Sequence, residues 1–390
     1  MPAGSLNIEL CLRSGRAADV RITSTRPDAA TRVLLGKTPE QVLTVVPLLF
    51  TLCGNAQAYA AVQVCRTALG LPSEPAMDAA REWLVQVETL REHAWRILLD
   101  WPSFIGLAPD KTHLAAWLKF DTQFRQLLFQ DGRAFRLDSR LAPDKAGLTR
   151  LLADLSALID TAIFAGRQAE FHALQTETQL QNWLVQNPAI AARLPDFLYR
   201  QEWAAIGQNP ITCLPEIDGQ ALERQIRNEE WAAFVRTPHW QGHCFETTLL
   251  NRQLGWPLIG VLHGQYGNGL IVRLLARLAE VANIPARLNQ LWAQINDGAV
   301  LPVDCSISDG IALAQVQAAR GLLIHRLVLR QGTVYDYRIV APTEWNFHPE
   351  GVVVQGLRRL QAQNPDNLRQ QAQLLVNAID PCVAIHLKID

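Results

Sequence analysis

Seven cysteines are the residues of this chain with the most evident capacity for chemistry. They are scattered along the sequence, at Cys11, Cys53, Cys65, Cys213, Cys244, Cys305 and Cys382. An odd number of widely spaced cysteines does not indicate a disulfide framework. The absence of any C-x-x-C pair also argues against a zinc ribbon or a thioredoxin-like site. We expect most of these thiols to be small core residues, so the question is which of them do more.

The composition predicts a soluble, folded protein with a sizeable core. Of 390 residues, 49% are hydrophobic, and 36 Lys and Arg balance 37 Asp and Glu. This balance gives no reason to expect nucleic acid or a membrane surface as a partner. The apolar stretch 42–53 is shorter than the ~18 residues of a membrane span, and residues 1–10 lack a signal-peptide pattern. We therefore expect a cytoplasmic location.

The segments before and after Cys53 have strand and helix patterns. Alternating apolar residues over 6–12 and 20–22 predict two strands joined by a turn. Thr38-Pro39-Glu40-Gln41 combines the cap, proline and glutamine that are typical of a helix start. A further helix is predicted from just after Cys53-Gly54 to Leu69, so Cys53 is expected at a helix start.

Most of the remaining chain has the apolar spacing of helices. Helical patterns cover residues 75–180, 246–286, 349–362 and 366–379. Residues 322–329 and 333–340 have strand patterns on the two sides of Gln331-Gly332 and predict a hairpin.

Together these elements predict an α+β fold that is predominantly helical. We expect one domain over 1–390, with strands in 1–37 and a mainly helical body in 38–320. A hairpin, helices and a cysteine-containing tail are expected in 321–390. Because no linker separates them, the N-terminal strands and the C-terminal hairpin are expected to form one small β-sheet.

Four motifs, in order along the chain, resemble those of the nickel–iron hydrogenase large subunit. Leu52-Cys53-Gly54-Asn55-Ala56 resembles Arg-x-Cys-Gly-x-Cys, and Ala318-Ala319-Arg320-Gly321 resembles Glu-Ala-Pro-Arg-Gly. Residues 337–346, which include Pro342-Thr343, are similar to Tyr-x-x-x-x-Pro-Thr/Ser-x-Trp-Asn. Residues 380–386 resemble the C-terminal Asp-Pro-Cys-x-x-Cys-x-x-His. The resemblance implies a large-subunit-like helical body along nearly the whole chain.

The departures from these motifs matter more than the matches. In the family, two cysteine pairs hold nickel and iron, and the second cysteine of each pair bridges both metals. Here Cys53 and Cys382 remain, but the second positions are Ala56 and Ile385. Neither side chain has a lone pair, so a two-metal site with four thiolates cannot form. His386 also stands two residues before the position of the family's last histidine.

This combination resembles the hydrogenase expression/formation proteins of the HupK and HoxV type. The resemblance implies a non-catalytic assembly scaffold that transiently carries an Fe(CN)2(CO) unit, with iron but no nickel. It also implies two protein partners, which are the hydrogenase large-subunit precursor and a small HypC-type maturation chaperone.

Cys53 and Cys382 are the expected iron ligands, because soft thiolates suit low-spin iron. Ferrous iron with two cyanides and two thiolates carries a net negative charge, which is costly to bury uncompensated. Arg320 is expected to offset this charge, and the Thr343 hydroxyl after Pro342 to donate to a cyanide. The helix start is expected to favour the Cys53 thiolate, and His386 is a further candidate near the ligands.

Simpler interpretations of these residues stay open. The thiols of Cys53 and Cys382 can be inert, and Arg320 can pair with a carboxylate. Thr343 can cap a turn, and His386 can have a packing or solvent role.

Two other functions also stay open. One is a working hydrogenase large subunit with an altered site, which the missing second cysteines disfavour. The other is a metal-free subunit like the quinone-site subunit of respiratory complex I, which the retention of Cys53 and Cys382 disfavours.

Overall fold

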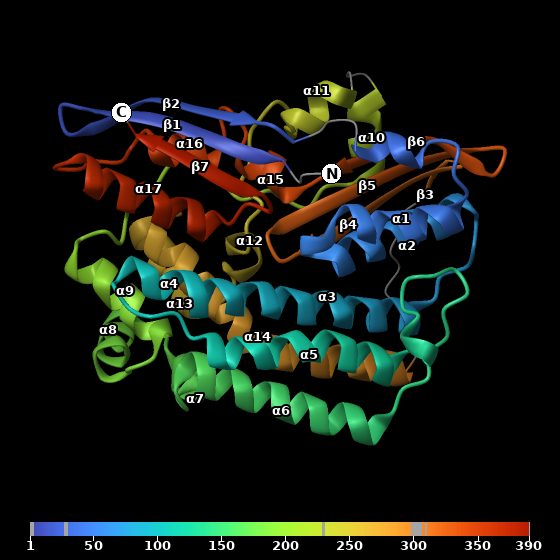
Figure 1. Cartoon of the computed structure of the whole chain (residues 1–390), viewed down its shortest axis with the longest axis horizontal. Helices are drawn as coiled ribbons and strands as arrows, with labels where there is room; N and C mark the ends of the chain where they lie inside the picture. Colours follow the sequence, from blue (N-terminus) through green and yellow to red (C-terminus); the bar gives the residue numbers. More distant parts are fainter. Residues whose placement is uncertain (1–3, 27–29, 228–230, 298–305, 309, 390) are drawn as a thin grey trace.

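Two β-sheets and a layer of long helices make up the molecule (Figure 1). The computed structural model describes residues 4–26, 30–227, 231–297, 306–308 and 310–389, so Cys305 lies outside the described residues. The strands are β1 Ser5–Arg13, β2 Arg16–Ser24, β3 Ser306–Ser308, β4 Ile311–Ala318, β5 Gly321–Arg330, β6 Thr333–Val340 and β7 Ala384–Ile389. The α-helices are α1 Pro39–Leu49, α2 Gly54–Ala68, α3 Pro75–Trp95, α4 Trp101–Phe104, α5 Lys111–Leu128, α6 Lys145–Phe164, α7 Gln168–Ala173, α8 Glu177–Gln186, α9 Ile190–Arg200, α10 Gly219–Arg227, α11 Trp231–Arg236, α12 Leu250–Gln253, α13 Pro257–Tyr266, α14 Leu270–Asp297, α15 Pro342–Asn346, α16 Val352–Leu357 and α17 Pro365–Ile379.

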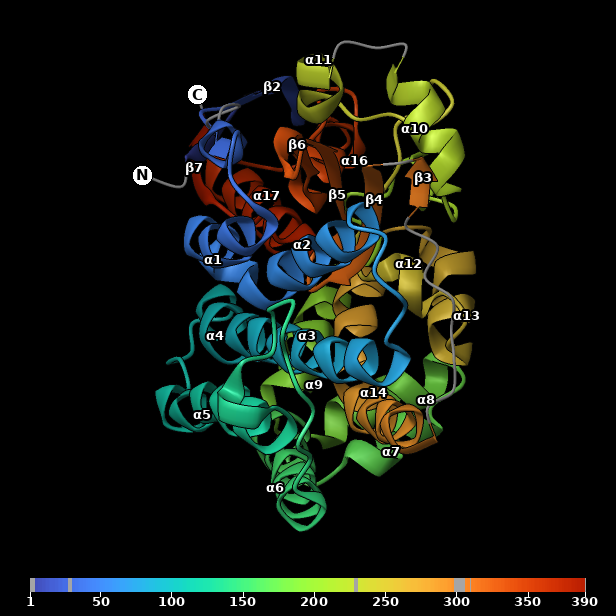
Figure 2. The same ribbon diagram turned by 90° about the vertical axis from the view of Figure 1, so that its right-hand side faces the viewer.

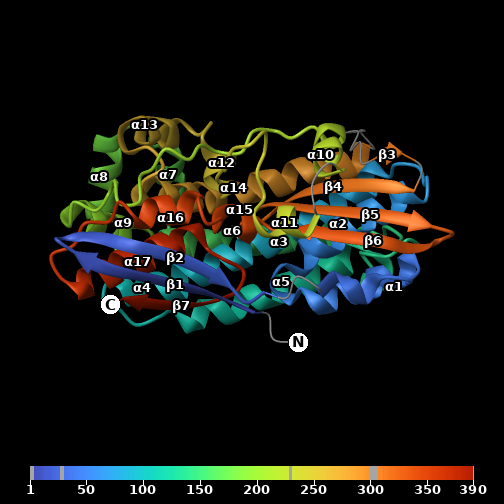
Figure 3. The ribbon, with the colours of Figure 1, turned by 90° about the horizontal axis from the view of Figure 1, so that it is seen from above.

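The strands form two separate sheets, with orders β2-β1-β7 and β3-β4-β5-β6 (Figure 3). The predicted N-terminal strand pair and the predicted β5–β6 hairpin are both present. The expectation that they share one sheet is wrong, because β7 pairs with β1 in parallel instead, with Ser5 opposite Ala384. Ile385 and Leu387 of β7 pack against the core of the smaller sheet, whose buried residues include Leu6 and Ile8. This burial holds the segment after Cys382 against the N-terminal strands.

The helices around Cys53 form where the sequence predicts them. Thr38 caps α1 through a reciprocal capping box with Gln41. Pro47 lies inside α1, which continues to Leu49. The next helix, α2, packs on β4 and β5 and also on α1 and α3. Its many buried alanines allow this close approach.

A layer of helices lies beneath the two sheets (Figures 1 and 2). The long helices α3 and α14 pack along one another, and α5 packs between α3 and α6. Trp83, Trp101 and Trp117 are almost completely buried in this layer. Large apolar side chains between helices contribute most of the packing energy of such a core.

No single helix in the described part of the chain is long and apolar enough to cross a membrane. Only α1 together with Thr51–Ala68 reaches the required length and composition, and this pair is bent by 102°. Every residue from Asn55 to Arg66 is buried within the protein itself.

Candidate metal centre

Cys53 lies directly before α2, at the position of its N-cap. Its thiol is partly buried and accepts a hydrogen bond from Gln57 Nε2 at 3.7 Å. The first free N–H groups of α2, those of Asn55 and Ala56, donate to the Glu88 carboxylate at 2.8 and 3.2 Å. Glu88 therefore occupies the positive end of this helix, and Cys53 makes no cap hydrogen bond.

The pKa of Cys53 follows from these surroundings. Its pKa is raised to about 12, first by burial and then by the nearby Cys382 and Glu88, while Arg320 opposes the rise. The expectation that the helix start favours the Cys53 thiolate is therefore wrong for the protein without metal. Burial, followed by the charges of Cys382 and Glu88, favours the neutral thiol of Cys53.

Cys382 lies between the end of α17 and the start of β7. Its backbone N–H donates to Thr343 Oγ1 at 3.2 Å, and the two side chains meet with Oγ1 3.0 Å from Sγ. Because the hydroxyl oxygen already accepts from this N–H, its own proton can stabilise the sulfur when that sulfur is ionised. Thr343 thus contacts Cys382 itself, and its expected contact with a cyanide stays a prediction. Pro342 begins α15 and is buried, which fixes Thr343 in place.

The two thiols lie near each other, although they come from opposite ends of the sequence. They are close enough for a charge on Cys382 to raise the pKa of Cys53, and Arg320 interacts electrostatically with both. The structure therefore brings together Cys53, Cys382 and Arg320, as the sequence analysis expected.

Arg320 is presented by the tight turn between β4 and β5. Ala318 and Gly321 are the last paired residues of that hairpin, so Arg320 is in the loop between them. Gly321 has a φ of +127°, and a Cβ atom there would lie 1.5 Å from the carbonyl oxygen of Thr247. Only glycine permits this close approach, and the approach fixes the turn that carries Arg320.

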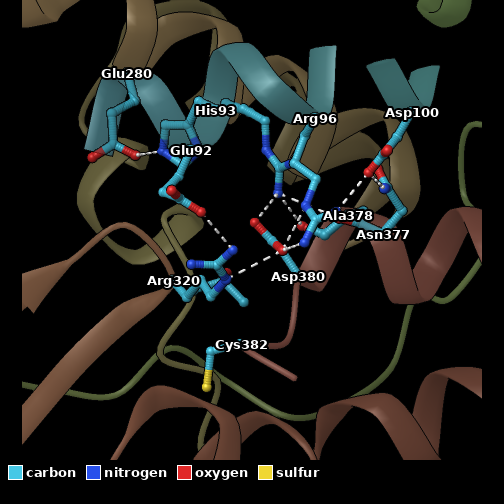
Figure 4. A network of polar contacts seen from close by, with 12 residues as sticks. Glu92, His93, Arg96, Asp100, Glu280, Arg320, Asn377, Ala378, Asp380 and Cys382 are labelled. Atoms are coloured by element: carbon cyan, nitrogen blue, oxygen red, sulfur yellow. Dashed lines mark hydrogen bonds and ion pairs between the residues drawn. The ribbon is translucent and has the colours of Figure 1, made fainter. Parts of the chain in front are cut away.

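A buried network of ion pairs holds the guanidinium of Arg320 (Figure 4). Its Nη2 lies 2.9 Å from Glu92 Oε2, and its Nε lies 3.3 Å from Asp380 Oδ1. Asp380 also pairs with Arg96 at 2.8 Å and with Arg277 at 3.7 Å. Burial alone would raise the pKa of Asp380, but Arg320, Arg96 and Arg277 hold it well below its ordinary value. The carboxylate is therefore charged and fixes the geometry.

Among the described residues, one nitrogen of Arg320 has no partner. Its Nη1 is buried and makes no hydrogen bond, whereas Nε and Nη2 are both paired. An unsatisfied buried donor costs free energy unless a ligand or water completes it. Arg320 and Cys382 both line a cleft of about 930 Å³. The guanidinium that carries this free donor thus lies at the wall of the cleft.

The replaced cysteine positions also lie at this site. Ala56 is buried in α2, and its N–H donates to Glu88. Ile385 is in β7 and lines the cleft. In the part of the chain that the structure describes, no group of three or more His, Cys, Asp or Glu side chains is arranged to hold a metal ion. The available donor set is thus two thiols beside a guanidinium, which suits one soft metal that brings its own ligands.

His386 does not belong to this site. It pairs with Asn7 along β7, and its side chain is exposed. Its neighbours Ile385 and Leu387 line the cleft beside Cys382, whereas the exposed His386 does not. The alternation of β7 directs Ile385 and Leu387 toward the protein and His386 toward solvent. A solvent role, and not a role near the two cysteines, therefore fits His386.

The sequence analysis did not identify several charged residues around the cysteines. Glu88, Glu92 and Arg96 occur at four-residue intervals and so lie on one face of α3 and its continuation. Glu88 is almost fully buried in a helix whose other inward residues are mainly apolar. A charged stripe at helical spacing within an apolar pattern is the signal that could have identified them, because charges are rarely buried unless they are paired.

Comparison with solved structures defines the class of fold. The Ni-Fe-Se hydrogenase from D. vulgaris Hildenborough superposes with a TM-score of 0.65, over 95% of this chain and 94% of that chain, at 15% identity. No family model matches the sequence. The molecule has the fold of the nickel–iron hydrogenase large subunit.

Comparison with curated proteins is more specific. The chain is 32% identical to the hydrogenase expression/formation protein HoxV of Cupriavidus necator, over 98% of this chain and 95% of that protein. It is 28% identical to the hydrogenase expression/formation protein HupV of Azotobacter chroococcum, over 99% of both. The chain belongs to the HoxV/HupK family of hydrogenase expression/formation proteins.

Proposed function

We propose that this protein is a maturation scaffold for nickel–iron hydrogenase. In this proposal Cys53 and Cys382 transiently hold an Fe(CN)2(CO) unit, which then passes to the hydrogenase large-subunit precursor. The observation that carries the proposal is the meeting of two thiols beside Arg320, with Ala56 and Ile385 at the bridging positions. Membership in a family of hydrogenase expression/formation proteins supports the general role.

The ligand set favours one iron without nickel. Two thiolates can bind a low-spin iron that already carries cyanide and carbonyl ligands. Without sulfur at positions 56 and 385, nothing at those positions can bridge a second metal. Fewer protein ligands also mean weaker retention, which suits a carrier that releases its cargo. We therefore propose a non-catalytic role.

The free Nη1 of Arg320 fits an anionic cargo. A cyanide nitrogen is a hydrogen-bond acceptor, and a charge-assisted bond to guanidinium is stronger than a neutral one. Glu92 and Asp380 hold the other two nitrogens, so the guanidinium is oriented before the cargo arrives. Such preorganisation lowers the entropy cost of binding.

The cleft beside Cys382 has features expected of a protein-docking site. Leu52, Trp95 and Leu118 line it, and each is more than two-fifths exposed. Exposed large apolar residues grouped around a cleft are typical of interaction surfaces. We propose that the large-subunit precursor and a small HypC-type chaperone exchange the iron unit here, in the cytoplasm.

Infrared spectroscopy tests the proposal directly. The protein is purified without oxygen from cells that contain the full maturation machinery. Cyanide and carbonyl stretches are expected in the wild type and absent in Cys53→Ala and Cys382→Ala. Cys11→Ala is the matched control, because Cys11 is also partly buried but lies on β1. Bands that persist in both site variants would overturn the assignment of the ligands.

Metal analysis of the same preparations separates the alternatives. The scaffold is expected to contain iron without nickel. Stoichiometric nickel together with hydrogen uptake would indicate a working hydrogenase subunit. Protein free of both metals would indicate a subunit of the complex-I type.

A further inference from the structure

A second arginine, Arg26, lies beside the cysteine pair, outside all four motifs. It follows the end of β2 and lines a cavity of about 390 Å³ together with Phe50, Thr343 and Glu344. Phe50 lies three residues before Cys53, and Thr343 is the residue whose hydroxyl meets Cys382. This cavity therefore adjoins the residue that contacts Cys382 and the segment that leads to Cys53.

An ion pair with Glu344 fixes Arg26 at this place. Arg26 Nη1 pairs with Glu344 Oε1, and the two side chains are only 18% and 16% exposed. The other carboxylate oxygen, Oε2, is buried without a hydrogen-bond partner. Glu344 is adjacent to Thr343 in α15, so the helix that positions the contact to Cys382 also positions Arg26.

The charge of Arg26 interacts with both thiols. Burial alone would lower its pKa, but the Glu344 carboxylate, Cys382 and Cys53 together raise it above the ordinary value. The guanidinium therefore stays protonated. Charges in a partly desolvated site interact more strongly than they do in water.

The network around Arg320 provides at most one net positive charge of its own. It contains four arginines and three carboxylates: Arg91, Arg96, Arg277, Arg320, Glu92, Asp100 and Asp380. A ferrous unit with two cyanides and two thiolates is a dianion. The cavity beside Thr343 is lined by Arg26, Arg236 and Arg338, and Arg26 is the arginine whose charge interacts with both cysteines.

We propose that Arg26 contacts an anionic ligand of the iron unit, so that the cargo is held between two guanidiniums, those of Arg26 and Arg320. This inference rests on the proposed function. It assigns Arg26 a specific role, which is to retain the cargo through its cyanide ligands and not merely to pair with Glu344.

The test must distinguish the proposed contact of Arg26 with the iron unit from the ion pair of Arg26 with Glu344. Arg26→Gln alone would leave Glu344 as a buried, unpaired carboxylate, which is itself destabilising. The informative comparison is Glu344→Gln against the double variant Arg26→Gln/Glu344→Gln, because neither contains that lone carboxylate. The two proteins differ only in the guanidinium. Arg26→Lys is a milder variant that keeps the charge without the planar group.

The readouts are the cyanide stretching bands and the rate at which the unit is lost to a chelator. Hydrogen bonding at a cyanide nitrogen raises its stretching frequency. Glu344→Gln is expected to keep both the bands and the retention. The double variant is expected to show at least one cyanide band at lower frequency and loss on the order of tenfold faster. Arg26→Lys should give a cyanide frequency and a rate of loss between those of Glu344→Gln and the double variant.

Exposed Arg13 of β1 provides the matched control, because Arg13→Gln removes an arginine whose ion pair with Asp19 is solvent-exposed. It should leave bands and retention unchanged. Identical bands and retention in Glu344→Gln and the double variant would overturn the role of Arg26 while the proposed function stands. A wild type without any bands would overturn both.

Discussion

At the scale of single residues, the two cysteines differ in their surroundings. Cys53 is next to the Glu88 carboxylate, which takes the free N–H groups of α2. Cys382 is next to the Thr343 hydroxyl. The first environment favours the neutral thiol, and the second offers a donor to sulfur. The candidate centre thus combines one ligand that must lose a proton with one that is already provided with a hydrogen bond.

Loading of iron should therefore release a proton from Cys53. Its pKa of about 12 means that the free protein carries a thiol here at neutral pH, whereas the metal binds a thiolate. Below that pKa, the apparent affinity for the iron unit should rise about tenfold per pH unit through this group alone. Competition with a chelator over the neutral pH range measures this slope. An affinity independent of pH would show that Cys53 is not a ligand.

The motifs predicted which residues would meet at the site but not how they interact. Cys53, Cys382, Arg320 and Thr343 are close together as expected. The neutral state of Cys53 could not be predicted, because it depends on Glu88 of a different helix. Arg26 was also missed, since it becomes a neighbour only through its ion pair with Glu344.

At the scale of elements, the turn between β4 and β5 determines the position of Arg320. The turn packs against Thr247, whose hydroxyl accepts from the N–H of Leu322 at 2.9 Å. Gly321 permits this contact at a φ of +127°. The turn between β5 and β6 also contains a glycine, Gly332, at a φ of +75°, but no atom lies within 4 Å of its would-be Cβ.

These two glycines form a matched pair for mutation. Gly321→Ala should cost more than about 3 kcal/mol of stability, because a backbone strain adds to a direct overlap with a carbonyl oxygen. Gly332→Ala should cost only about 1 kcal/mol of stability, because its added methyl group meets no other atom and only the backbone strain at positive φ remains. Chemical denaturation compares the free energies of unfolding. Equal losses would mean that the contact with Thr247 does not constrain the turn.

The elements themselves were largely predictable from local patterns. The capping box at Thr38, the start of α2 after Cys53 and the β5–β6 hairpin are all confirmed. Sheet membership was not predictable, because the pairing of β1 with β7 joins segments from opposite ends of the sequence. The alternation of Ile385, Leu387 and Ile389 is the pattern that could have indicated a strand there.

At the scale of the whole molecule, Asp380 connects distant parts of the chain. It pairs with Arg320 of the β4–β5 turn, with Arg277 of α14 and with Arg96 just after α3. The backbone of Asp380 has the left-handed conformation, with a φ of 64°, and it ends α17 just before Cys382. Removing this one carboxylate leaves buried guanidiniums without their counter-charge.

We expect Asp380→Asn to destabilise the fold by about 3–5 kcal/mol, as is typical when one partner of a buried ion pair is removed. The pH dependence provides a second measurement. The folded-state pKa of Asp380 is lowered, so its contribution is complete above the ordinary value of 3.8 and is lost as the pH falls below it. The acid-induced decrease in the free energy of unfolding should therefore be smaller in Asp380→Asn. If the free energy of unfolding of Asp380→Asn fell with acid as steeply as that of the wild type, the Asp380 carboxylate would not be the stabilising counter-charge.

The parallel pairing of β7 with β1 has a consequence for when the cargo can be taken up. A ribosome makes Cys53 early, whereas Cys382 emerges only after the whole helical layer and the larger sheet have been synthesised. A nascent chain thus holds one of the two proposed ligands for most of its synthesis. Under the proposed function, iron delivery has to wait until translation has passed Cys382 and the late strand has docked on the early one.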